Sequence, residues 1–137
     1  MQSETVRIQA KISDLAAITT DAKRVAEAAA RTWREIHAVF SPVIGPRAAA
    51  ALYQRSLYVA STRCPCLAAV REDALRPGEF TGLQIVLSQQ TSAGAAAANG
   101  ALLQTFCDLL ANLVGVSLTE RLLRSVRSFP DGLDSWT

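Results

Sequence analysis

The spacing of apolar residues along the chain predicts α-helices almost throughout. In the second half, a long helix is predicted because apolar residues recur at intervals of three and four, at Leu102, Leu103, Phe106, Leu109, Leu110, Leu113 and Val114. In the first half, the same spacing from Val25 to Phe40 predicts a second long helix, which Thr20 or Asp21 can cap. The alanine-rich run Thr91–Ala101 suits the start of the later helix, where small side chains allow another helix to approach closely.

A single glycine interrupts each of these patterns. At Gly115 the apolar pattern of the later helix stops. Ser117 and Glu120 then form an S-x-x-E sequence, which predicts a capping box at the start of a new helix. At Gly45 the other pattern stops, and Pro46 occupies a plausible first helical position. Each glycine therefore predicts a corner between a long helix and a shorter one.

The two corners indicate that the chain consists of two related halves. Setting Gly45 on Gly115 shifts the sequence by 70 residues and places apolar residues on apolar residues, in the pairs Trp33/Leu103, Ile36/Phe106, Val39/Leu109, Phe40/Leu110, Val43/Leu113 and Ile44/Val114. We predict an all-α bundle of about four to six helices, because one helix–corner–helix unit cannot bury its apolar face alone. The single domain (1–137) would comprise halves at about 20–70 and 81–128, a loop at 71–80 and a tail at 129–137.

Two local predictions are less direct. Residues 4–12 alternate between apolar and polar, as in a strand, but Ile8, Ile12 and Leu15 also suit a helix. We predict a helix, since no second strand pattern exists with which this segment could pair. Pro65 is expected to end the helix that begins at Pro46.

Composition favours a small cytoplasmic protein. The chain has 137 residues, of which 50% are hydrophobic but only 6% aromatic, and a net charge of +2. The charge is too small to predict a nucleic-acid partner, and no apolar run is long enough to cross a membrane. The first ten residues lack the basic and apolar blocks of a signal peptide, and three cysteines are an odd number, so free thiols in a reducing compartment are expected.

The candidate ligand site centres on His37, the only histidine. Helical spacing places it one turn after Trp33, beside the apolar face. A small molecule or haem could lie between helices near this position, because bundle interiors often hold such pockets. The predicted lining is Trp33, His37, Tyr53, Phe106 and Cys107.

Two further groups of residues are candidate sites. Cys64 and Cys66 could take part in zinc or redox chemistry, although their spacing is not the C-x-x-C of the usual motifs. A basic strip and the C-terminal tryptophan could contact a partner protein; these residues are Arg121, Arg124, Arg127 and Trp136.

These patterns favour association over catalysis. No nucleophile motif, phosphate-binding glycine loop or metalloprotease signature occurs. We therefore expect a non-enzymatic regulatory or adaptor module without a cofactor, in bacterial signal transduction, acting as a homodimer and on an unidentified protein partner. A small-molecule or haem sensor is the alternative, and a cysteine-based zinc or redox site is the third hypothesis.

Overall fold

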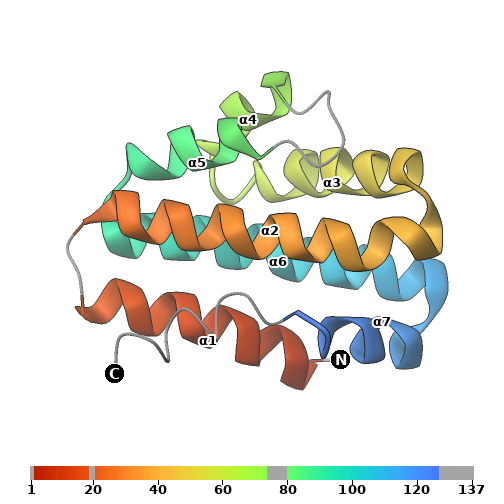
Figure 1. Cartoon of the computed structure of the whole chain (residues 1–137). Helices are drawn as coiled ribbons and strands as arrows, with labels where there is room; N and C mark the ends of the chain where they lie inside the picture. Colours follow the sequence, from red (N-terminus) through yellow and green to blue (C-terminus); the bar gives the residue numbers. More distant parts are fainter. Residues whose placement is uncertain (1, 19–20, 74–79, 127–137) are drawn as a thin grey trace.

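The computed structural model describes residues 2–18, 21–73 and 80–126, and within them it contains helices joined by short turns and no strands. Its seven helices are shown in Figure 1. The all-α class predicted from the apolar spacing is therefore confirmed. The helices are α1 (Gln2–Ile18), α2 (Ala22–Ile44), α3 (Pro46–Ala60), α4 (Leu67–Asp73), α5 (Thr81–Ser88), α6 (Ser92–Val114) and α7 (Val116–Leu123).

The long helices α2 and α6 pack against each other at the centre and run in the same direction (Figure 1). Helix α5 packs mainly on α2, and α1 packs mainly on α6. Helix α3 also packs on α6, α7 contacts both α6 and α2, and α4 lies against α3 and α5. Each long helix is thus covered by elements from the other part of the sequence.

The two long helices have matching ends. Each contains 23 residues, and both their first and their last residues are 70 positions apart, at 22 and 92 and at 44 and 114. The side chain of Asp21 caps α2 by accepting a hydrogen bond from the Lys23 amide at 3.0 Å. The Thr91 hydroxyl caps α6 in the same way, accepting from the Gly94 amide at 2.9 Å. Of the two caps predicted for α2, the structure uses Asp21.

The predicted corners occur at both glycines, with almost the same backbone conformation. Gly45 has φ 91° and ψ 148°, and Gly115 has φ 94° and ψ 154°. Each amide donates to a carbonyl of the preceding turn, Ser41 or Ala111, at 2.8 Å. A positive φ combined with an extended ψ is a conformation essentially confined to glycine, so the requirement for glycine is steric.

The predicted capping box after Gly115 is wrong. Helix α7 begins at Val116 with Gly115 itself as the N-cap, and no side chain caps it. Because the helix restarts immediately after the glycine, Ser117 is already its second residue and is past the capping position. The Thr119 hydroxyl instead donates to the Gly115 carbonyl at 2.8 Å.

Other boundaries differ from the predictions. Helix α3 ends at Ala60 rather than at Pro65, because the chain then forms turns in which the Arg63 and Cys64 amides both donate to the Ala60 carbonyl at 3.0 Å. Helix α4 extends to Asp73, into the first residues of the predicted loop at 71–80. With α1 and α4 included, the described residues form more helices than the four to six expected. The predicted tail at 129–137 lies outside the described residues.

The N-terminal segment is a helix, as predicted. Ile8, Ile12 and Leu15 of α1 are buried in the core. Helix α6, on which α1 packs, buries the small residues Ala95, Ala96 and Ala98. Helix α1 can therefore lie close against α6, as the alanine-rich run predicted. None of the helices in the described part of the chain has both the length and the apolar character needed to cross a membrane.

Candidate functional site

Aromatic rings from four segments meet around Trp33 at the centre of the molecule. The Trp33 ring lies 5.2 Å from that of Phe106 on α6 and 5.4 Å from that of Tyr53 on α3, measured between centroids. Phe80, which precedes α5, lies 5.0 Å from Tyr53 in an edge-to-face arrangement. Such pairs stabilise a fold beyond the area that they bury. The aromatic cluster is defined here as Trp33, His37, Phe40, Tyr53, Phe80 and Phe106.

A chain of polar side chains fixes the orientation of Trp33. Its indole Nε1–H donates to Asn99 Oδ1 at 2.8 Å, and both residues are buried. Asn99 Nδ2 in turn donates to Gln9 Oε1 at 3.2 Å, and Gln9 Nε2 donates to the Ala96 carbonyl at 2.9 Å. The network links α2, α6 and α1, and it satisfies the one polar atom of the tryptophan.

Two polar groups of the aromatic cluster are perturbed by burial. The Tyr53 hydroxyl is buried without a hydrogen-bond partner, and burial raises its pKa well above the ordinary value. His37 is only partly buried, and desolvation lowers its pKa below the ordinary value. The free space between the side chains is about 10 Å³. That volume is roughly the minimum that one water molecule requires.

The structure brings together four of the five residues predicted to line a ligand site. Trp33, His37, Tyr53 and Phe106 all belong to the aromatic cluster. Cys107 does not border its free space; the thiol is fully buried, interacts with the Thr5 side chain on α1, and has a pKa raised to about 11 by burial. Sequence analysis missed Phe80, because a lone aromatic residue beside a polar segment has no periodicity to reveal it.

The two remaining cysteines lie in the turn between α3 and α4. Cys64 and Cys66 are partly buried and pack against the core. Burial raises the pKa of Cys66, and the neighbouring Cys64 raises it further. In the described ranges, no three histidine, cysteine or acidic side chains lie close enough together to hold a metal ion. The predicted zinc chemistry therefore has two thiols near each other but no third ligand among these residues.

The basic strip on α7 is partly engaged within the molecule. Arg121 is exposed. Arg124 Nε lies 3.8 Å from Glu4 Oε1, and Arg7 Nε donates to Glu4 Oε2 at 2.9 Å. Arg7 also donates to the Leu123 carbonyl at 3.2 Å. These contacts attach α7 to α1. The other two predicted partner-binding residues, Arg127 and Trp136, lie outside the described residues.

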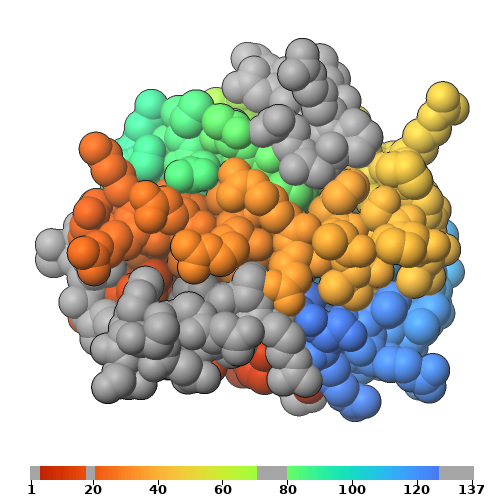
Figure 2. Space-filling model, viewed as in Figure 1, coloured from red at the N-terminus to blue at the C-terminus, as the bar shows by residue number. Residues whose placement is uncertain are grey.

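Both glycine corners lie at the same end of the molecule, and large aliphatic side chains are exposed there. This end is at the right of Figure 1, and Figure 2 shows the α2–α3 corner in gold beside α7 in blue. The corner patch is defined by three residues with high exposed fractions, Val43 (48%), Leu113 (59%) and Val116 (54%). Val43 lies two residues before Gly45, and Leu113 lies two residues before Gly115, so the two side chains occupy equivalent positions.

Comparison of the sequence with protein-family models, and of the chain with curated proteins and solved structures, gave no significant match. A function can therefore be argued only from the residues and their arrangement.

Proposed function

We propose that the protein is a non-enzymatic regulatory module that acts by helix-mediated association, with a second copy of itself as its partner. The corner patch is the observation that carries this proposal. Three aliphatic side chains, each about half exposed, lie at one end of this small protein. Single exposed apolar residues are normal on protein surfaces, whereas a group of them is typical of an interaction site.

We further infer that the two halves of the chain are versions of one helix–corner–helix unit. Support comes from the equal lengths of α2 and α6, their constant offset of 70 residues and the near-identical dihedral angles of Gly45 and Gly115. The packing is also paired: α1 covers α6 as α5 covers α2, and α3 contacts α6 as α7 contacts α2. This pairing is expected of two units related by an approximate two-fold axis along the central helices.

Such an arrangement suits self-association through the corner patch. Each half contributes an apolar residue at the equivalent position, Val43 or Leu113, so the patch itself has approximate two-fold character. Symmetric dimers form when a patch is complementary to itself. In this proposal, dimerisation is the event that transmits the signal. We assign the protein to bacterial signal transduction in the cytoplasm, where the dimer would act on a further protein partner.

The sensor hypothesis is less well supported. The unpartnered Tyr53 hydroxyl and the neighbouring His37 would offer polar contacts to a ligand. However, a free space of about 10 Å³ leaves no room for a molecule larger than water unless several aromatic rings move. Those rings are in mutual contact, so their displacement would cost packing energy. We therefore prefer association to ligand binding at this position.

Sedimentation velocity of the purified chain across micromolar concentrations tests the proposal. We expect a concentration-dependent dimer, whose dissociation constant the double substitution Val43→Ser and Leu113→Ser raises by at least about tenfold. Ile85→Ser is the matched control, since Ile85 is 53% exposed on α5, away from the corners, and should leave the dimer intact. A monomer at every concentration, or an equal effect of Ile85→Ser, would refute self-association through the corner patch.

A further inference from the structure

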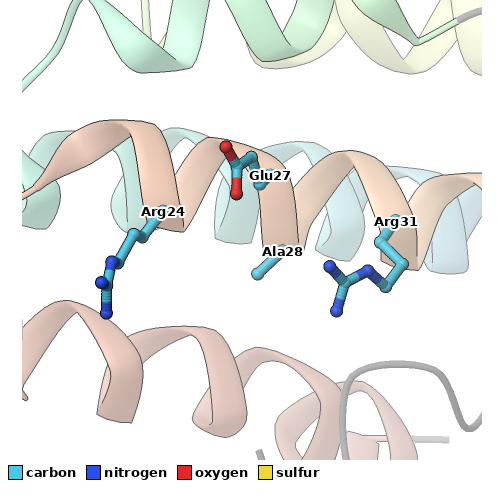
Figure 3. A pocket seen from close by; sticks show the side chains of 4 residues that line it. All are labelled: Arg24, Glu27, Ala28 and Arg31. Carbon is cyan, nitrogen blue, oxygen red and sulfur yellow. The ribbon is translucent and has the colours of Figure 1, made fainter. Parts of the chain in front are cut away.

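A hollow on the side of α2 is lined by charged residues that none of the functions above uses. Its volume is about 300 Å³, and the described residues that line it are Arg24, Glu27, Ala28 and Arg31. Figure 3 shows these side chains. The volume lies at the lower end of the range for small-molecule sites. It is far larger than the space within the aromatic cluster.

The two arginines lie on one face of the helix, on either side of an alanine. Arg24, Ala28 and Arg31 follow the spacing i, i+4, i+7, which places them along one side of α2. In Figure 3 both arginines extend to the same side of the ribbon, and Glu27 points away from them. Ala28 is buried, so its methyl group forms a low floor between the two long side chains.

Both guanidinium groups are available to bind an anion. Arg24 and Arg31 are exposed, and neither forms an ion pair or a hydrogen bond with another side chain among the described residues. Arg24 lies in the first turn of α2, where the helix dipole adds positive potential. Lys23 and Arg34, also exposed on α2, add to the positive charge of this helix. Glu27 is the one acid among the described residues that line the hollow, and its side chain points away from both arginines in Figure 3.

The spacing of the arginines determines the kind of anion that fits. Seven residues of α-helix span about 10 Å, so a single small anion cannot form a full two-bond contact with each arginine unless both side chains bend strongly. A ligand with two linked anionic groups can contact one arginine with each group. Guanidinium groups bind phosphate through two parallel hydrogen bonds, which makes arginine well suited to this recognition.

We propose that this hollow is a binding site for a small ligand of the diphosphate class, with Arg24 and Arg31 each binding one phosphate group above Ala28. Glu27 on the same turn weakens the binding by repulsion. The site is separate from the corner patch, so its occupancy can be measured whether or not the protein dimerises. In the regulatory module proposed above, a phosphorylated metabolite that binds in this hollow would be the signal to which the protein responds.

Isothermal titration with inorganic pyrophosphate at low salt tests the site. We expect saturable binding that Arg24→Ala and Arg31→Ala each weaken by at least about tenfold. Glu27→Gln should tighten it, because it removes the nearby negative charge while keeping the side-chain size. Arg34→Ala is the matched control: it removes the same charge from the same helix, at an exposed position that does not line the hollow.

Three results would overturn the proposal. Equal weakening by Arg34→Ala would mean that pyrophosphate responds only to the overall charge of α2. Orthophosphate binding as tightly as pyrophosphate would remove the two-point contact. No saturable heat with pyrophosphate at millimolar concentration would show that the arginines do not form a site. Far-ultraviolet circular dichroism of each variant would verify that the helices remain intact, because these exposed side chains contribute little to the core.

Discussion

Asn99 holds the indole of Trp33 in the centre of the core. Replacing Asn99 by alanine leaves the buried Nε1–H without an acceptor and also removes the contact with Gln9. We expect the free energy of unfolding to fall by about 2–3 kcal/mol, measured by urea denaturation. Gln104→Ala is the control: this amide also lies on α6, but it bonds to Asp108 at an exposed site, so its loss should cost about 0.5 kcal/mol or less.

A double-mutant cycle separates this hydrogen bond from general packing. In a Trp33→Phe background the indole donor is absent, so Asn99→Ala should cost less than it does in the natural chain. An equal cost in both backgrounds would contradict the assigned role of Asn99. The residue also marks a limit of sequence analysis. Asn99-Gly100 looks like a weak point of the helix, and only the tertiary contact with Trp33, 66 residues away, explains its presence.

The three thiols should differ sharply in reactivity. Burial raises the pKa of Cys107 to about 11, and none of its surface is exposed. At pH 8, below both this value and the 9.0 expected of the unfolded thiol, the group is protonated in both states and folding is unaffected. We therefore expect a disulfide reagent such as dithiobis(nitrobenzoate) at pH 8 to label Cys64 and Cys66 first, and Cys107 only at the rate of unfolding.

Peptide mapping of the labelled chain checks this order. Rapid labelling of Cys107 in the folded protein would mean that α1 does not cover the thiol. The same experiment bears on the zinc hypothesis. If Cys64 and Cys66 held a metal ion, both would be protected until a chelator was added, and labelling without chelator argues against such a site.

At the scale of single elements, the glycine corners are the features most open to test. A Cβ added at Gly45 or Gly115 would meet no atom within 4 Å, so the cost of a side chain there is conformational. We expect Gly45→Ala and Gly115→Ala each to lower the free energy of unfolding by about 1–3 kcal/mol, because both positions require a positive φ. Thermal and urea denaturation would measure both values.

Ser117→Ala distinguishes the corner from the capping box that the sequence predicts. Loss of a serine N-cap typically costs about 1 kcal/mol. Because α7 begins at Val116, Ser117 does not cap it, and the substitution should change stability by less than about 0.5 kcal/mol. A cost near 1 kcal/mol would show that the helix begins two residues later in solution, at Leu118.

The predictability of each element follows from its length. The ends of α2 and α6 were predicted closely, since long apolar stripes bounded by capping residues and glycines are strong local signals. Helix α4 was missed: Leu67–Asp73 is too short to be stable alone, and its contacts with α3 and α5 stabilise it. For the same reason the end of α3 at Ala60 could not be inferred from Pro65.

At the scale of the whole molecule, each long helix is covered mainly by a helix from the other part of the sequence. Helix α1 lies mainly on α6 and α5 mainly on α2, so the principal contacts join helices that precede residue 74 to helices that follow residue 79. The aromatic cluster is divided in the same way: Trp33 and Tyr53 precede α4 in the sequence, and Phe80 and Phe106 follow it. Sequence periodicity predicted which faces are apolar, but it could not show which helix each face meets.

Because the principal helix contacts join the two parts of the chain, we predict that neither part folds alone. Fragments 1–76 and 77–137, divided between α4 and α5, would each expose the apolar face of a 23-residue helix when alone. We expect both to show little helix by circular dichroism, and an equimolar mixture to regain most of the helical signal and the shielded tryptophan fluorescence of Trp33. Trp33 needs Tyr53 from its own fragment and Phe106 and Asn99 from the other, so its emission reports the assembled core once Trp136 of the second fragment is replaced by phenylalanine. A first fragment that is helical and shields Trp33 without the second would mean that the contacts between halves are not required for folding.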